Sequence, residues 1–201
     1  YGPAIEYAGL STYGPFIDED TSYGGSYMRN YNGKNQGFMS MRDCLKNSVN
    51  TCALQAFRLT TNDQKYEFAT NLGIKFDSTY LPDSYSIGTF NAITPVTLAG
   101  AYAAFGNGGY FTEPYSFTKL VYRETDEVYE QDIERKRVMK PQTAYLISSV
   151  LVGATSSRVH VSGTQIATKT GTTSYDEKVL KGYGLTNSVI PDSWISSYSP
   201  D

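Results

Sequence analysis

Two short clusters contain the residue types that acyl transfer requires. The first is Lys169-Thr170-Gly171, which ends the apolar run Ile166-Ala167-Thr168 and is followed by Thr172 and Thr173. Such a strand edge combines an ammonium, hydroxyls and an exposed backbone, which suits an anionic substrate that approaches main-chain N–H groups closely. A Lys-Thr-Gly triplet is expected about 0.1 times by chance in this composition, so it carries some information. The alternative is a strand that simply leads into a Thr-rich turn.

The second cluster is Ser48-Val49-Asn50, the one Ser-x-Asn triplet in the sequence. About one such triplet is expected by chance, so its position matters more than its occurrence. It lies in a predicted break between two helices, where polar side chains can face a cleft. The alternative is that Asn50 caps the following helix. Both can hold, because a capping loop can also present a catalytic serine.

The elements around these clusters follow from apolar periodicity and capping signals. Strands are predicted over residues 165–170 and 192–198, and a hairpin around a turn at 123–127. The predicted helices are one that ends near Gly9, one from the N-cap Ser40 to Lys46, one after the 47–50 break, and residues 62–72, 96–105 and 141–153. This pattern predicts an α/β or α+β domain with an antiparallel sheet flanked by helices.

Two other features are expected to have no role in chemistry. Residues 11–36 are rich in Gly, Tyr, Ser, Asn and Asp, typical of an irregular surface segment, and the acidic run Asp18-Glu19-Asp20 within it is interpreted as solvated. A continuous helix would separate Cys44 and Cys52 by about 12 Å, which exceeds disulfide reach. A bridge would need a chain reversal that residues 47–50 supply only in part, so we expect free, buried thiols.

Composition narrows the class of protein. The 201 residues carry 17 Lys plus Arg against 20 Asp plus Glu, a net charge of −3 that argues against a nucleic-acid partner. One histidine and two cysteines are too few soft ligands for a structural zinc site, and neither a metal nor a cofactor is predicted. The 18 tyrosines and few cysteines suit a domain outside the cytoplasm. The first residue is Tyr1 and the last are Ser-Pro-Asp, which suggests a piece of a longer chain.

Together the motifs resemble a known family. Ser-x-Asn followed by Lys-Thr-Gly-Thr resembles two of the three motifs of the penicillin-binding protein, serine D,D-peptidase and serine β-lactamase superfamily. Residues 1–201 resemble the central to C-terminal part of one transpeptidase domain of class A penicillin-binding proteins. The similar segments are Tyr1 to Tyr7, Asn32-Gly33-Lys34, Thr94 to Phe105, Gly106 to Gly109, Thr143-Ala144-Tyr145 and Asp192 to Asp201.

The resemblance implies a role for each motif residue. Ser48 would relay a proton to the leaving amine, and Asn50 would donate to the substrate amide and help to position a catalytic lysine. Lys169 would make the cleft electropositive. The hydroxyls of Thr170 and Thr172 would contact the substrate carboxylate, and the Thr172 N–H would form half of an oxyanion hole. Gly171 would keep the strand edge open, and Thr173 completes the substrate-binding set.

One motif of the family departs from its expected place. The nucleophile is the serine of Ser-x-x-Lys, which precedes Ser-x-Asn, whereas the one such sequence here is Ser116-Phe117-Thr118-Lys119. It follows Ser48 and lies in a predicted strand, where Ser116 and Lys119 would point to opposite faces. We therefore reject Ser116. The family pattern places the nucleophile a few residues before Tyr1, on a companion fragment of the same polypeptide, and this chain alone is expected to be inactive.

The resemblance implies a D,D-transpeptidase that cross-links peptidoglycan stem peptides ending in D-Ala-D-Ala and that β-lactam antibiotics trap as an acyl-serine. The location would be the extracytoplasmic face of the bacterial membrane. One alternative is a D,D-carboxypeptidase or β-lactamase of the same fold, although no Glu-based deacylation motif lies between Ser48 and Lys169. Another is a non-catalytic relative that senses β-lactams or binds cell wall.

Overall fold

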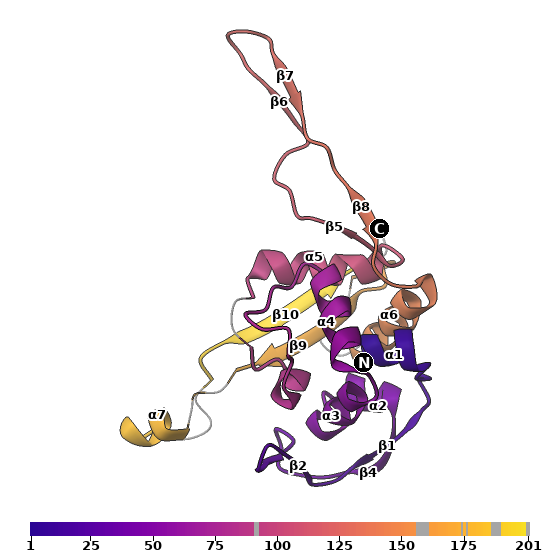
Figure 1. The fold of residues 1–201 in the computed structure, drawn as a ribbon, viewed down its shortest axis with the longest axis vertical. Coiled ribbons are helices and arrows are strands. Elements are labelled where there is room, and N and C mark those ends of the chain that lie inside the picture. Colours follow the sequence, from indigo (N-terminus) through magenta and orange to yellow (C-terminus); the bar gives the residue numbers. More distant parts are fainter. Residues whose placement is uncertain (91–92, 156–160, 174, 176, 186–189, 200–201) are drawn as a thin grey trace.

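The centre of the molecule is a pair of strands with helices packed against it. In the computed structural model, which describes residues 1–90, 93–155, 161–173, 175, 177–185 and 190–199, β9 (Ala167–Thr172) pairs antiparallel with β10 (Ser193–Tyr198). Helix α6 (Pro141–Thr155) packs against β9, and α5 (Pro95–Gly106) packs against both β10 and α6 (Figure 1). The predicted strands and both long helices are therefore confirmed.

The remaining helices surround this centre. They are α1 (Gly2–Ala8), α2 (Met41–Lys46), α3 (Asn50–Arg58), α4 (Asn62–Asn71), the 3₁₀ helix η1 (Asp83–Ile87) and α7 (Glu177–Gly182). The main core cluster joins α1, α2, α3 and α6 to β9, with Met41, Val150 and Ala167 among its buried side chains. A second cluster joins α4, α5 and α6. No helix in the described ranges is long and apolar enough to cross a bilayer.

Capping chemistry sets the helix ends as predicted. The Ser40 hydroxyl accepts a hydrogen bond from the Asp43 N–H at the start of α2. Thr94 caps α5 in the same way through the Thr97 N–H. Helix α1 ends at Gly9, whose left-handed backbone (φ 66°) is the conformation that glycine adopts without steric cost.

The predicted α/β fold, with antiparallel strands flanked by helices, is confirmed, and its strands form small sheets. The described residues form five separate two-stranded antiparallel sheets, and the β9–β10 pair packs against both α5 and α6. Two pairs, β5 (Tyr110–Thr112) with β8 (Arg135–Arg137) and β6 (Lys119–Val121) with β7 (Val128–Glu130), build an arm that extends away from the body (Figure 1). The predicted hairpin at residues 123–127 is the tip of this arm.

The segment 11–36 is more ordered than predicted. It contains β1 (Pro15–Asp18), which pairs with β4 (Gly37–Ser40), and the short hairpin of β2 (Thr21–Tyr23) and β3 (Ser26–Met28). Asp18 is not solvated, since it is 1% exposed. The alternation of buried and exposed residues along β1 directs Asp18 inward, so an acidic run did not indicate exposure for each of its members.

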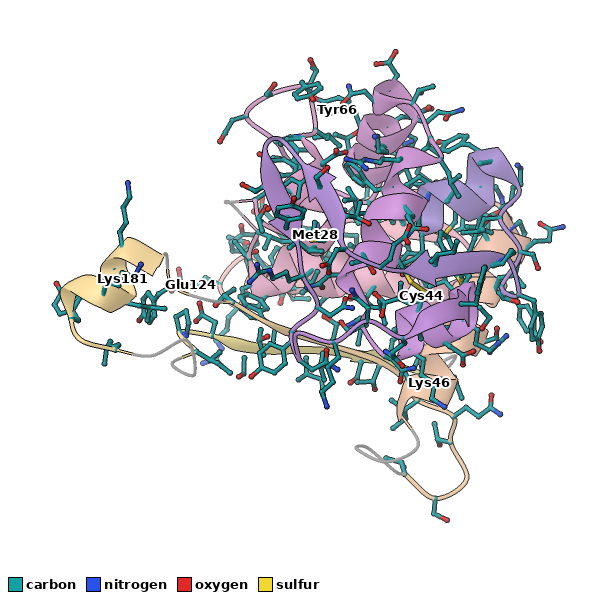
Figure 2. The ribbon with its side chains drawn as sticks, turned by 90° about the horizontal axis from the view of Figure 1, so that it is seen from below. Met28, Cys44, Lys46, Tyr66, Glu124 and Lys181 are labelled. Atoms are coloured by element: carbon teal, nitrogen blue, oxygen red, sulfur yellow. A yellow bond between two sulfur atoms is a disulfide. The ribbon has the colours of Figure 1, made fainter. Side chains whose placement is uncertain are left out.

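The expectation of free cysteines is wrong. Cys44 in α2 and Cys52 in α3 are fully buried and form a disulfide, with their Cα atoms 6.0 Å apart (Figure 2). Helix α2 ends at Lys46 and α3 begins at Asn50, so the chain reverses between the two cysteines. The estimate of about 12 Å assumed a continuous helix, and the break at residues 47–49 removes that assumption.

We expect removal of this disulfide to destabilise the α2–α3 pair. Cys44→Ala with Cys52→Ala should lower the free energy of unfolding by about 2–4 kcal/mol, because the short closed loop restricts the unfolded chain. Urea unfolding with and without reductant measures the effect. Reductant should weaken the wild type and leave the double variant unchanged. Two titratable thiols in the unfolded wild type without reductant would contradict the disulfide.

Candidate active site

Ser48 and Lys169 meet where the α2–α3 turn faces β9. The Lys169 ammonium donates a hydrogen bond to Ser48 Oγ at 2.8 Å and another to the Thr170 carbonyl oxygen at 2.7 Å. The two partners of the first bond are 121 residues apart in the chain. A pocket of about 230 Å³ lies at this junction, lined by Lys46, Asn47, Ser48, Ala154, Thr168, Lys169 and Thr170. The structure thus brings Ser48, Lys169 and Thr170 together.

Ser48 has a backbone conformation that is unusual for a serine. Its φ is +57°, in the left-handed region, and among the described residues Asp126 is the one other non-glycine residue with a positive φ. This conformation costs a residue with a Cβ about 1–3 kcal/mol. Buried Val49 follows it and is held by a hydrogen bond from its N–H to the Cys44 carbonyl, so the turn exposes Ser48 while its neighbour is in the core.

One edge of β9 faces away from β10. The Thr173 N–H donates to the Asp192 carbonyl, which places the main-chain groups of Thr173 on the β10 side. Since successive residues of a strand point their main-chain groups to opposite edges, those of Thr172 and Thr170 lie on the outer edge. The bond from Lys169 to the Thr170 carbonyl agrees with this assignment. Within the described residues β9 has no second strand partner.

The other strand residues differ in what they contact. Gly171 and Thr172 are exposed beyond the pocket. A Cβ at Gly171 would meet only Trp194 Cβ, at 3.9 Å, which is ordinary van der Waals contact. Thr173 Oγ1 accepts a hydrogen bond from the Asp192 N–H at 3.2 Å. The structure therefore turns the Thr173 hydroxyl toward β10 and not toward the pocket lining.

Asn50 is held differently from its predicted role as a helix cap. The N-cap of α3 is Val49, which makes no side-chain cap, and Asn50 is the first helical residue. The Asn50 N–H donates to Asn30 Oδ1 at 2.9 Å, and Asn50 Nδ2 donates to the Arg29 carbonyl at 2.8 Å. Asn50 is not among the residues that line the pocket. Sequence reasoning missed Asn30, because nothing in the local pattern links it to a helix 20 residues later.

Ser116 does not lie in a helix. It is in an exposed bend before β6, on the chain that leads out along the arm, and only Lys119 of the Ser-x-x-Lys sequence is in the strand (Figure 1). The position disfavours Ser116 as a nucleophile, since no helix N-terminus or neighbouring lysine one helical turn away supports it.

Two tyrosines with raised pKa values, Tyr102 of α5 and Tyr198 of β10, pack against the main core cluster. Burial raises the pKa of Tyr102 to about 12, with Tyr198 adding to the shift. Burial also raises the pKa of Tyr198, against a lowering by its hydrogen bond with Ser148. Both phenols stay neutral near neutral pH and serve packing. In the part of the chain that the structure describes, no group of three or more His, Cys, Asp or Glu side chains is placed to hold a metal ion.

The chain is similar to known proteins. Residues 3–201 match the family model of the penicillin-binding protein transpeptidase domain. The chain is 35% identical to penicillin-binding protein 1A/1B of Bacillus subtilis over its whole length, which is 23% of that protein. It is 30% identical to penicillin-binding protein 1A of Clostridium novyi, with 84% of this chain and 21% of that protein covered.

Solved structures share the fold. Penicillin-binding protein A from M. tuberculosis, in a ceftriaxone acyl-enzyme complex, superposes with a TM-score of 0.81 at 21% identity, covering 99% of this chain and 49% of that one. A D,D-transpeptidase domain from Eggerthella lenta gives 0.77 at 17% identity, covering 99% of this chain and 54% of that one. This chain spans about a quarter of the first curated relatives and half of these structures. By the family match over residues 3–201, the chain belongs to the penicillin-binding protein transpeptidase domain family.

Proposed function

We propose that this chain supplies the Ser48–Lys169 half of a D,D-transpeptidase site that cross-links peptidoglycan stem peptides ending in D-Ala-D-Ala. The observation that carries the proposal is the 2.8 Å hydrogen bond from Lys169 Nζ to Ser48 Oγ, beside the edge of β9 that faces away from β10. Residues 1–201 are the central to C-terminal part of the transpeptidase domain. The nucleophilic serine and its lysine belong to a Ser-x-x-Lys segment that precedes Tyr1 in the polypeptide.

The hydrogen bond from Lys169 to Ser48 supports a role for Ser48 as a proton relay. Because the Lys169 ammonium donates to Ser48 Oγ, the hydroxyl hydrogen of Ser48 points to another acceptor. The nucleophilic serine attacks the carbonyl carbon of the penultimate D-Ala, and its proton passes through its lysine and Ser48 to the amine of the departing D-Ala. An amine of a second stem peptide then attacks the acyl-serine, and the serine oxygen leaves and regains a proton.

The strand edge defines how the substrate binds. An extended peptide adds to the outer edge of β9 as a further strand, hydrogen-bonded to main-chain groups of Thr170 and Thr172. The Thr172 N–H then donates to the carbonyl oxygen that becomes negative in the transition state. Lys169 and the Thr170 and Thr172 hydroxyls attract the terminal carboxylate. Gly171 has no side chain that could obstruct the peptide. Its described surroundings would accept a Cβ, so we attribute the glycine to substrate binding and not to packing.

Two further assignments rest on the same proposal. β-Lactam antibiotics would acylate the serine of the Ser-x-x-Lys segment, and penicillin-binding protein A from M. tuberculosis forms a ceftriaxone acyl-enzyme complex. The domain would work on the extracytoplasmic face of the bacterial membrane, where a disulfide such as Cys44–Cys52 is stable.

Intact-mass spectrometry with penicillin G tests the proposal on the polypeptide that contains residues 1–201 and those before Tyr1. We expect one covalent adduct, mapped by peptide digestion to a serine before Tyr1. If that segment has been cleaved, the adduct appears on a separate co-purifying fragment. An adduct on Ser116 would overturn the assignment of the nucleophile, and no adduct would favour a non-catalytic relative.

Replacing Lys169 should slow this reaction. Lys169→Ala removes both the donor to Ser48 and a positive charge at the pocket, so acylation by penicillin G should be at least about tenfold slower. The acylation rate is measured by mass spectrometry at several times of incubation. Lys46→Ala is the matched control, because Lys46 lines the same pocket with the same charge. Equal effects of the two substitutions would show that only net charge matters and would contradict the role given to Lys169.

The backbone of Ser48 gives a second prediction. At φ +57° an alanine keeps the backbone strain that a glycine relieves. The free energy of unfolding of Ser48→Gly, measured by urea denaturation, should therefore exceed that of Ser48→Ala by about 1 kcal/mol. This order is the reverse of that in an ordinary helix. Both variants lose the hydroxyl, so both should acylate at least about tenfold more slowly than the wild type. An alanine variant as stable as the glycine variant would contradict the left-handed turn.

A further inference from the structure

The start of helix α3 is capped by a residue from another segment. Its N-cap, Val49, makes no side-chain hydrogen bond, and such a helix start leaves its first N–H groups without intrahelical partners. Asn30 fills this place from the chain that follows β3, because its Oδ1 accepts from the Asn50 N–H at 2.9 Å. The preceding residue, Arg29, accepts from Asn50 Nδ2 at 2.8 Å. Residues 29 and 30 therefore hold both the main chain and the side chain of Asn50.

Asn30 is itself fixed by a buried carboxyl. Its Nδ2 donates to Asp18 Oδ1 at 2.7 Å and to the Lys34 carbonyl at 3.0 Å. The same Asp18 oxygen accepts from Thr51 Oγ1 at 2.5 Å, and Asp18 Oδ2 accepts from the Gln36 N–H at 2.8 Å. Asp18 is 1% exposed, so these bonds form in a region shielded from water. A buried carboxyl with three donors is rigid, since loss of any donor leaves an unsatisfied polar group.

We propose that Asn30 and Asp18 are positioning residues for the Ser48–Asn50 turn. Through Asn50 and Thr51 they fix the first two residues of α3, and Ser48 lies two residues before that start. Ser48 must hold its hydroxyl at hydrogen-bond distance from Lys169, which lies on a different element. A shift of the helix start by about 1 Å would cost about a hundredfold in rate in a site that depends on such geometry. This inference rests on the function proposed above.

The contact with residue 29 also orients the side-chain amide of Asn50. Its amide has two N–H hydrogens and one oxygen, and one of these hydrogens is used by Arg29. That bond fixes the rotation of the amide, so the remaining hydrogen and Oδ1 keep defined directions for a substrate carbonyl and for the lysine of Ser-x-x-Lys. Loss of Asn30 would free the backbone that carries this amide.

Asn30→Ala tests the proposal against a closely matched control. Like Asn30, Asn62 bridges two main-chain groups with its side-chain amide, since it donates to the Thr79 carbonyl and accepts from the Leu81 N–H, each at 2.8 Å. Asn30→Ala should slow acylation by penicillin G about 10–100-fold, whereas Asn62→Ala should stay within about threefold of the wild type. Rates are measured well below the melting temperature of each variant. Equal rates for the two variants would overturn the proposal.

A paired substitution separates positioning from general destabilisation. Asn30→Asp alone brings a second carboxyl against Asp18, whereas Asp18→Asn with Asn30→Asp restores a donor and an acceptor across that contact. We expect the double variant to acylate at least about fivefold faster than Asn30→Asp, because it removes the repulsion between two carboxyls that would push residue 30 away from the Asn50 N–H. Absence of this rescue in a folded double variant would count against Asn30 and Asp18 as a positioning pair.

Hydrogen exchange gives a readout that does not depend on enzymatic activity. The Asn50 N–H should exchange at least about tenfold faster in Asn30→Ala than in the wild type, while amides of α6 change little. If the wild type forms no acyl adduct, the proposed function fails, and exchange at Asn50 still tests the capping contact. If the wild type is acylated and Asn30→Ala is acylated at the same rate, the positioning role alone fails.

Discussion

The hydrogen bond between Lys169 and Ser48 is the constraint that the rest of the site depends on. It joins a turn between two short helices to a strand that comes 121 residues later, so no local interaction can set its length. Lys169 and Ser48 are each held in place by separate tertiary contacts. The strand is fixed by β10 and α6, and the turn by the α2–α3 pair. The site is therefore as precise as the packing between these two units, which meet through α6.

The turn between α2 and α3 is held by two kinds of tertiary contact, a disulfide and a set of buried hydrogen bonds. Cys44 and Cys52 bracket Ser48 at four residues on either side and join α2 to α3 covalently. At the start of α3, hydrogen bonds link the buried Asp18 to Asn50 through Asn30. Helices of 6 and 9 residues are too short to be stable alone, so tertiary contacts of this kind must supply their order. The chain places a covalent and a polar support around one exposed hydroxyl.

Sequence patterns predicted most of the elements, because their signals are local. Ser40, Thr94 and Gly9 define helix ends through contacts within a few residues, and the strands of the β9–β10 pair show their apolar residues directly. The site residues Ser48, Lys169 and Thr170 followed from motifs that resemble a family, and the structure brings them to one pocket.

What sequence reasoning missed depends on contacts between distant segments. The disulfide was rejected because the distance across residues 44–52 was estimated for a straight helix, and the reversal at residues 47–49 was given too little weight. Asp18 was assigned to a solvated run because its neighbours are acidic, although β1 turns it inward toward Thr51. Asn50 was considered as the cap of the following helix, whereas it is the first helical residue and its N–H donates to Asn30. Each error replaced a tertiary contact by a local rule.

Two residues at the site break local rules in opposite directions. Ser48 has a left-handed backbone that glycine would adopt at lower cost, yet it carries a side chain. Gly171 lies inside a strand, where glycine is unfavourable, and its own surroundings would accept a Cβ. Gly109 shows the contrast, because its positive φ of 91° and the nearby Met139 carbonyl both require glycine for folding. Folding explains Gly109 but neither Ser48 nor Gly171. Ser48 keeps its hydroxyl although its backbone conformation costs stability, and Gly171 has no side chain although one would fit. The hydrogen bond from Lys169 to Ser48 joins the two elements that carry them. Such paired exceptions are expected at functional sites, where a chain gives up stability for function.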